Sequence, residues 1–268
     1  MHHRTDIVYQ YDGSFDGFLC CVFRAVYQRE DPMAIFSEDG AQVTLLETAL
    51  IDTEPDKAGR VLRSIPAKMG TDALRAVQWC FLSDLEDRET AILTFLRLGY
   101  RVGSPVMRML TDPRVHKVVT AARNVANEAH LLKGFTRFSD HGGALVAEIE
   151  PKNHVLPILA RHFRARMPGE SFLIHDRTHK LVLLCSGGCC QILPLEELSL
   201  PRADGQEQLY RQLWTRFYDT VSIESRYNPR CRMTHMPKRY WAMMTEFQPE
   251  SQAFALPEVS SPSSEKLR

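Results

Sequence analysis

The chain has 268 residues, of which 44% are hydrophobic and 25% charged, and its 33 Lys and Arg balance 33 Asp and Glu. This composition is typical of a folded domain, and no apolar run approaches the roughly 20 residues that a membrane-spanning helix needs. The N-terminus lacks the apolar stretch of a signal peptide, and an odd number of cysteines, seven, argues against a complete disulfide framework. We therefore expect a cytoplasmic protein without membrane contact.

The charges are unevenly distributed along the chain. Residues 30–56 contain eight acids and no Lys or Arg, whereas residues 97–137 contain eight cations against two acids. A basic face of this kind can bind polyanions, and an acidic face keeps the rest of the surface away from them. The alternative is that the two stretches average out in three dimensions.

The N-terminal half reads mainly as helices. Residues 6–11 alternate and predict a short strand, and Ser14 is placed to cap a helix that runs from Phe15 to about Glu30. Residues 44–46 predict a second short strand. Four further helices are expected, over residues 56–67, 71–83, 88–98 and 106–110.

The longest predicted helix covers residues 113–135 and begins with Pro113, which suits a first helical position. Its apolar residues repeat at spacings of three and four, so one face is buried. On the opposite side, Arg123, Asn127, His130 and Arg137 fall near one stripe, with Lys133 adjacent. This stripe either binds phosphates or is simply solvated.

The second half predicts more strand. Strands are expected over residues 144–149, 172–175, 181–185 and 191–193, with helices over 155–167 and 207–222. The fold class is therefore α+β, a helix-rich N-terminal half packed with a small, mostly antiparallel sheet. We expect one domain over residues 1–247, with a possible internal boundary near 138–143. The Ser-, Pro- and Glu-rich tail, residues 248–268, is expected to be disordered.

The segment 225–245 combines cations with aromatic rings. It contains five cations and no acid, and two prolines interrupt any continuous helix. Cations contact phosphates and flat rings stack on unpaired bases, so the segment predicts a surface that binds polyanions; the alternative is a structural tail in which the rings pin the segment to the core. The predicted contact residues, with two from the long helix, are Arg226, Tyr227, Asn228, Arg230, Arg232, Lys238, Arg239, Tyr240, Trp241, Arg123 and His130.

Candidate catalytic chemistry is sparse. Cys185, Cys189 and Cys190 resemble a metal motif but lack a second cysteine pair, so packing in a strand and turn is favoured. Asp12 and Asp16 flank a glycine turn and could hold a metal or act as acid and base, with His162 or His235 assisting. Helix capping and core packing are the simpler roles for them. No nucleotide-binding or hydrolase motif is present, and we expect no cofactor and no bound metal.

Three separated stretches, residues 11–23 (YDGSFDGFLCCVF), 147–163 (AEIEPKNHVLPILARHF) and 226–241 (RYNPRCRMTHMPKRYW), are similar to the bacterial family called "probable DNA metabolism protein", a domain of unknown function. Members of that family are encoded beside a radical S-adenosylmethionine (radical SAM) DNA-modification or repair protein. In some bacteria the domain is fused to a uracil-DNA-glycosylase-like domain. The resemblance implies a role in DNA repair or modification, but it supplies no catalytic residues.

Three hypotheses about function follow. The first is an accessory protein that binds single-stranded or damaged DNA and works with a radical SAM partner. The second is a DNA-processing enzyme in its own right, for which the sequence supplies no particular reaction. The third is a protein–protein adaptor without direct DNA contact, in which the acidic residues 30–56 meet a basic partner.

Overall fold

The computed structural model describes residues 5–38, 46–199, 205–221 and 228–248. The chain divides into two compact units, the first made of residues 1–130 and 151–158 and the second of residues 131–150 and 159–268. The chain therefore changes unit at 130/131, and the expectation of one domain over 1–247 stays a prediction. Among the described residues, no helix is both long and apolar enough to cross a membrane.

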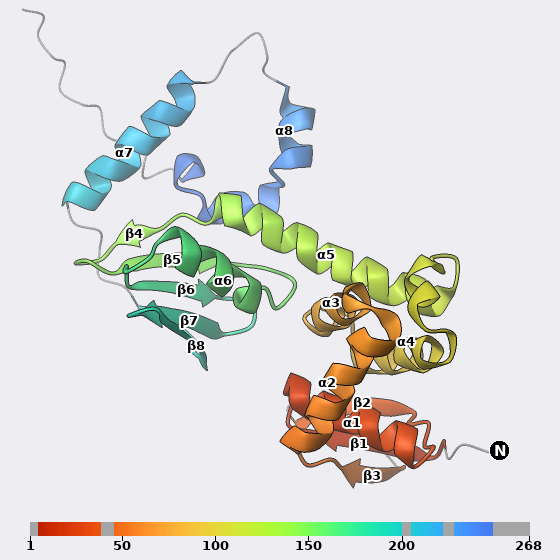
Figure 1. Ribbon diagram of the computed structural model, residues 1–268. Coiled ribbons are helices and arrows are strands. Elements are labelled where there is room, and N and C mark those ends of the chain that lie inside the picture. Colours follow the sequence, from red (N-terminus) through yellow and green to blue (C-terminus); the bar gives the residue numbers. More distant parts are fainter. Residues whose placement is uncertain (1–4, 39–45, 200–204, 222–227, 249–268) are drawn as a thin grey trace, which may run out of the picture. The chain divides into compact units, whose positions relative to one another are not determined.

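The first unit contains a small sheet and most of the helices (Figure 1). Its elements are β1 (Ile7–Tyr11), α1 (Phe15–Tyr27), β2 (Ala34–Ser37), β3 (Glu47–Leu50), α2 (Pro55–Met69), α3 (Thr71–Phe81), α4 (Arg88–Val102), the 3₁₀ helix η2 (Ser104–Arg108) and most of α5 (Pro113–Phe135). The helix-rich N-terminal half is confirmed. The strand expected over 44–46 lies mostly outside the described residues; β3 begins just after it, and β2 was not predicted.

The sheet of the first unit is parallel, with strand order β2-β1-β3. Its central strand is buried on both faces, since Ile7, Val8 and Tyr9 are each at most 3% exposed. Burial on both faces is typical of parallel strands, which helices cover. At the end of β1 the predicted cap is confirmed, because the Ser14 hydroxyl accepts a hydrogen bond of 2.9 Å from the Gly17 amide.

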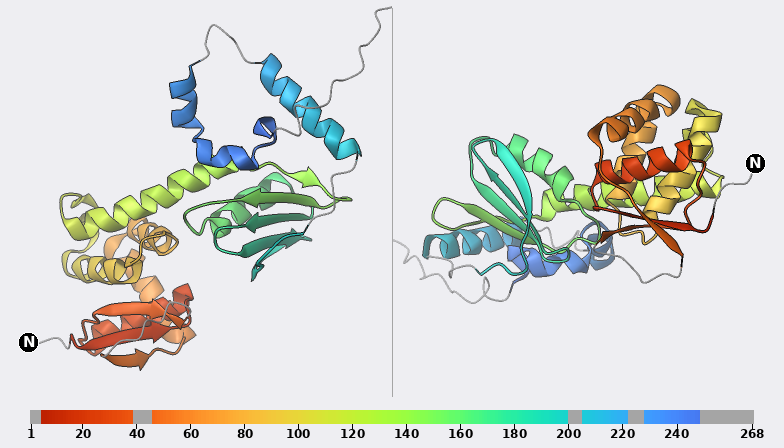
Figure 2. Two further views of the ribbon diagram at one scale, coloured as in Figure 1. Left: turned by 180° about the vertical axis from the view of Figure 1, so that it is seen from behind. Right: turned by 90° about the horizontal axis from the view of Figure 1, so that it is seen from below.

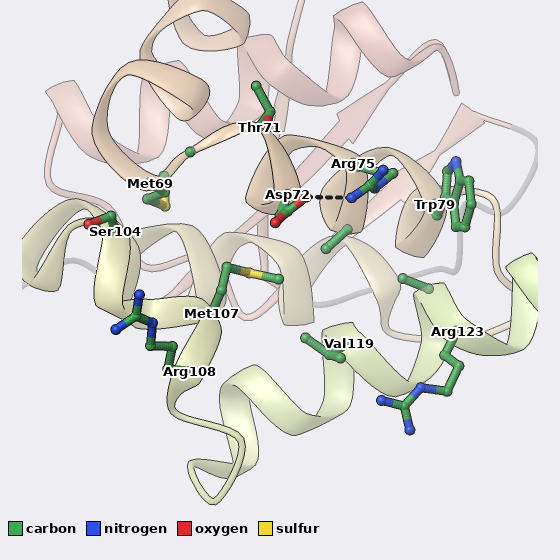
Figure 3. Close-up of a pocket in the computed structure, with 13 residues that line it drawn as sticks. Met69, Thr71, Asp72, Arg75, Trp79, Ser104, Met107, Arg108, Val119 and Arg123 are labelled. Atoms are coloured by element: carbon green, nitrogen blue, oxygen red, sulfur yellow. Dashed lines mark hydrogen bonds and ion pairs between the residues drawn. The ribbon is translucent and has the colours of Figure 1, made fainter.

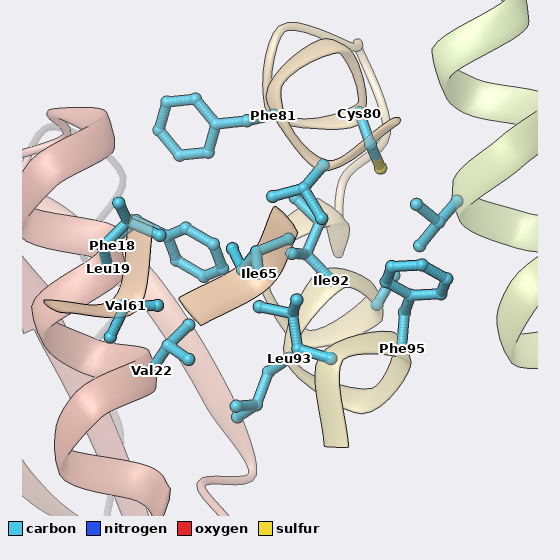
Figure 4. Close-up of a cluster of buried hydrophobic side chains, with 14 of the residues drawn as sticks. Phe18, Leu19, Val22, Val61, Ile65, Cys80, Phe81, Ile92, Leu93 and Phe95 are labelled. Carbon is cyan, nitrogen blue, oxygen red and sulfur yellow. The ribbon is translucent and has the colours of Figure 1, made fainter. Parts of the chain in front are cut away.

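The core of the first unit lies between α1, α2, α3 and α4 (Figure 4). Phe18 stacks on Phe81 with ring centroids 5.5 Å apart, and Ile65 and Leu93 belong to the same buried cluster. Cys80 is fully buried in the same cluster, which accounts for it as a core residue.

One loop of the first unit is held by a buried carboxylate. Glu128 on α5 is 3% exposed and accepts hydrogen bonds from the Lys152 amide at 3.0 Å, the Asn153 amide at 2.8 Å and the Asn153 side-chain amide at 2.6 Å. The Asn153 side-chain oxygen in turn accepts from the Asp84 amide at 3.1 Å. Residues 151–158 thereby join the first unit although their neighbours in sequence belong to the second.

The second unit is built on a five-stranded sheet with order β4-β5-β6-β7-β8 (Figures 1 and 2). Its elements are β4 (Ser139–Asp140), β5 (Leu145–Ile149), most of α6 (Leu156–Arg166), β6 (Phe172–Asp176), β7 (Leu181–Ser186), β8 (Cys189–Pro194), α7 (Gly205–Thr220), α8 (Pro229–His235) and the 3₁₀ helices η4 (Lys238–Met243) and η5 (Thr245–Phe247).

The α+β class is confirmed, but the expectation of a small, mostly antiparallel sheet is wrong. The five-stranded sheet is mixed: β5 and β6 are parallel, and the other three pairings are antiparallel. A parallel pair needs a crossover, and α6 supplies it. Phe163 of α6 meets Phe172 of β6 with ring centroids 6.4 Å apart, which fixes the helix against the sheet. The parallel sheet of the first unit also went unpredicted.

A buried carboxylate joins three parts of the second unit. The Glu246 side chain is 0% exposed and accepts two hydrogen bonds from the Arg137 guanidinium, at 2.7 and 3.1 Å. The Trp214 indole of α7 donates a third, at 3.1 Å. One carboxylate of η5 therefore binds both the loop after α5, through an ion pair, and helix α7, through a hydrogen bond.

Candidate nucleic-acid interface

The segment that the sequence singled out is folded as two short helices. Asn228 caps α8, because its side-chain oxygen accepts from the Cys231 amide at 3.1 Å, and Pro229 takes the first helical position. Pro237 then separates α8 from η4. The predicted interruption of the helix is confirmed. Arg226 and Tyr227 lie outside the described residues, and capping already occupies the Asn228 oxygen.

Arg232 lies among aromatic rings. Its guanidinium carbon is 4.7 Å from the ring centroids of both Trp241 and Phe247 and 5.9 Å from that of Tyr218. Its Nε is buried and has no hydrogen-bond partner among the described residues. Cation–π attraction of this kind is strongest when water is excluded, so Arg232 ties α8 to η5 and α7.

The two predicted stacking residues that are described here also make internal contacts. Trp241 stacks on Phe247 with centroids 4.6 Å apart and donates from its indole to the Met236 carbonyl at 3.0 Å. Tyr240 is 4% exposed, packs on Phe135 at 5.5 Å and accepts a hydrogen bond from Arg239. For Tyr240 to stack on a base, its ring would first have to leave Phe135.

Several cations of the second unit are exposed and unpaired. Arg230 on α8 and Lys238 on η4 contact no carboxylate among the residues that the structure describes. Lys238 lies over the Trp241 ring at 5.8 Å. The end of α6 carries three more exposed arginines without a described ion-pair partner, which the sequence analysis did not single out: Arg161, Arg164 and Arg166.

The pKa of His162 reflects the positive charges near the end of α6. Burial lowers the pKa of His162, and the charges of Lys133 and Arg166 lower it further. Two other cations of this unit are paired with carboxylates: Arg177 with Glu150 and Lys180 with Glu196. The unpaired cations on α6, α8 and η4 are available to an anionic partner.

The predicted long-helix residues belong to the first unit. Arg123 and His130 are both exposed on α5, as the stripe of the helix predicts. Arg123 also lines a pocket of about 630 Å³ between α3, η2 and α5 (Figure 3). Arg75, Trp79 and Arg108, which share this pocket, were not predicted.

The four catalytic candidates are divided between the two units, with Asp12 and Asp16 in the first and His162 and His235 in the second. Asp12 accepts hydrogen bonds from the Ser14 amide and hydroxyl and from the Thr53 hydroxyl, at 2.7 to 2.9 Å. Burial raises its pKa, but these bonds lower it more, so the pKa of Asp12 lies below its ordinary value. Asp16 is exposed in the first turn of α1. Both fit the helix-capping role.

The two histidine candidates lie in the second unit. His162 meets Phe163 edge-on with ring centroids 5.0 Å apart. His235 is exposed at the end of α8, where its Nδ1 is 2.9 Å from the Cys231 carbonyl. Among the described residues, no three His, Cys, Asp or Glu side chains are grouped so as to hold a metal ion.

The cysteine-rich hairpin forms a disulfide that the sequence analysis missed. Cys185 and Cys190 are register partners on β7 and β8 and are bonded to each other. The turn between them contains Gly187 and Gly188 at φ values of 58° and 79°, a region that favours glycine. Cys189 is free and exposed.

Taken together, the described residues define an α+β protein with exposed, unpaired cations in both units. The family model of DUF4130, a domain of unknown function, matches residues 86–246, more than half of the chain. The chain therefore belongs to the DUF4130 family. No curated protein and no solved structure matches it.

Proposed function

We propose that this protein is a DNA-binding accessory protein of DNA repair or modification, acting on single-stranded or damaged DNA beside a radical SAM partner. The observation that carries the DNA-binding part is the set of exposed, unpaired cations on α6, α8 and η4. The repair context and the partner come from the resemblance to the DNA-metabolism family.

In this proposal, the internal contacts of the C-terminal segment present its charges. Arg232 and its aromatic neighbours hold α8 and η4 in place, and Arg230 and Lys238 are left in solvent to contact phosphates. A preformed array of cations loses less conformational entropy on binding than a flexible tail does. Of the predicted aromatic residues, Trp241 keeps part of its surface exposed and remains the candidate to meet a base.

In this proposal, the partner protein binds to the exposed apolar face of α7. Leu213 and Phe217 on this helix are 47% and 55% exposed, and Val221, which follows the helix, is 56% exposed. Large apolar side chains that gather on one exposed helix face are typical of protein contacts. This face supports the partner half of the proposal in the same way that the cations support the DNA half.

The double variant Arg230→Ala/Lys238→Ala should weaken binding to single-stranded DNA about 10-fold at low salt. Each phosphate contact releases counterions. The loss of two contacts should therefore reduce the steepness of the plot of log K against log salt concentration by about 1.4. Fluorescence anisotropy with a labelled oligonucleotide, repeated over a series of salt concentrations, measures both quantities.

The matched control is Lys57→Ala/Arg177→Ala, which removes two cations that already pair with Glu54 and Glu150. We expect this control to bind like wild type, with an unchanged slope. Equal losses in both double variants would mean that net charge alone drives binding. Absence of any binding by the wild type at low salt would reject the DNA-binding function.

A further inference from the structure

The pocket of the first unit has the size of a small-molecule site. Its volume of about 630 Å³ lies within the range of about 300 to 1,000 Å³ that ligand pockets occupy. It lies between three elements, α3, η2 and α5, and the end of α2 (Figure 3). All of α3 precedes the family match, whereas η2 and α5 fall inside it, so the family domain alone supplies only part of this pocket.

The lining of this pocket combines an apolar surface with a polar rim. Apolar contact comes from Met69, Ala76, Met107, Val119 and Ala122. Trp79 is half-buried and adds a flat indole to one wall. A surface of this kind accepts a flat, weakly polar ring, since aromatic side chains stack on bases of any sequence.

The polar rim carries an excess of positive charge. Three arginines and one carboxylate line the pocket, an excess of two positive charges. Asp72 pairs with Arg75 on the same helix. Arg108 and Arg123 are exposed, and among the described residues no carboxylate pairs with either of them. Each of these guanidinium groups, one from η2 and one from α5, can donate two parallel hydrogen bonds to the oxygens of a phosphate monoester.

We propose that this pocket binds a nucleoside monophosphate, either free or as the 5′-phosphorylated end of a DNA strand. Arg108 and Arg123 hold the phosphate, and the base lies against Trp79 and the apolar floor. The two features that a nucleotide needs, a dianion site and a flat apolar surface, occur together in one cavity. This site uses residues other than the cations of α6, α8 and η4, so it goes beyond the proposed function and does not depend on it.

Isothermal titration calorimetry with deoxyadenosine monophosphate tests the proposal. Arg108→Ala/Arg123→Ala should weaken binding at least about 10-fold, because the phosphate loses its charge-assisted hydrogen bonds. Trp79→Ala should weaken it about 10-fold through lost stacking, and Trp79→Phe should retain most of the affinity. Circular dichroism of each variant shows whether the fold is intact.

The control Lys57→Ala/Arg63→Ala removes two cations of α2 that do not line the pocket, and it should bind the nucleotide like wild type. Inorganic phosphate and deoxyadenosine should each bind more weakly than the nucleotide. A 5′-phosphorylated oligonucleotide that competes better than its 5′-hydroxyl form identifies a strand end as the ligand, and equal competition identifies the free nucleotide.

Three results would overturn the assignment: no binding of the nucleotide by wild type at millimolar concentration, unchanged binding in Arg108→Ala/Arg123→Ala, or inorganic phosphate binding as tightly as the nucleotide. Arg230→Ala/Lys238→Ala separates this site from the proposed DNA-binding surface, since that variant should keep nucleotide binding. Failure of the DNA assay with intact nucleotide binding would therefore reject only the proposed function.

Discussion

Glu246→Ala should lower the free energy of unfolding of the second unit by about 3 kcal/mol. The carboxylate is fully buried and holds Arg137 through two hydrogen bonds and Trp214 through a third. Removal of one partner of a buried ion pair costs about 3 to 5 kcal/mol, because the other charge is left without compensation. Arg137 keeps 21% of its side chain exposed, so water recovers part of this loss and the lower end applies.

Urea unfolding of the Trp79→Phe background measures this effect, since the two remaining tryptophans, Trp214 and Trp241, both lie in the second unit. The matched control is Glu196→Ala, which breaks an exposed ion pair with Lys180 and should cost less than about 1 kcal/mol. A loss as small for Glu246 as for Glu196 would contradict the central role of this carboxylate.

The pH dependence of the same pair follows from the shift at Glu246. Burial raises its pKa, but the hydrogen bond and charge of Arg137 lower it more, so the folded-state pKa lies below the ordinary value of 4.5. A carboxyl group whose pKa is lowered by folding stabilises the fold fully at pH values above its unfolded-state pKa. This stabilisation is lost as the pH falls through the folded-state pKa. The difference in the free energy of unfolding between wild type and Glu246→Ala should therefore become smaller below about pH 4.5.

Glu128→Ala should destabilise the first unit by about 3 kcal/mol. Three donors of residues 152 and 153 lose their acceptor, and a buried donor without a partner costs about 1 to 3 kcal/mol. Water that enters the space should accept hydrogen bonds from some of these donors. The total cost in free energy should therefore stay near the upper value for one unsatisfied donor. Amide hydrogen exchange at residues 82–84 and 152–155 should accelerate most, because Asn153 also accepts from Asp84.

A double-mutant cycle with Asn153→Ala shows whether the two side chains act as a unit. We expect a coupling energy of about 1 to 3 kcal/mol, since residues that share a hydrogen bond are not additive. Additive losses within about 0.5 kcal/mol would mean that Glu128 and Asn153 stabilise the unit separately.

Local patterns predicted the helices well. The helix over 113–135 has the predicted bounds, because a proline at its first position and an unbroken apolar face specify it locally. The Ser14 cap and the strands expected over 172–175 and 181–185 are also confirmed, and they depend on neighbouring residues only. The conformation of the segment 228–248 follows from its prolines in the same way.

The arrangement of strands and of site residues depends on distant contacts and could not be read locally. The parallel pairing of β5 and β6 needs α6 to cross between them, which periodicity alone does not reveal. The apolar stripe of α7 predicted a helix correctly, but Leu213 and Phe217 on it are exposed among the described residues. Arg75, Arg108 and Arg123 come from three elements, so no spacing in the sequence marks their shared pocket.

The discontinuity of the first unit has a consequence for synthesis on the ribosome. Residues 151–158 complete that unit by donating hydrogen bonds to the Glu128 carboxylate, yet they follow twenty residues that belong to the second unit. Domains generally fold as units while the chain emerges, N-terminal part first. Here the N-terminal unit cannot reach its final form until Ile158 has emerged from the ribosome. By then the first strands of the other unit have already been synthesised.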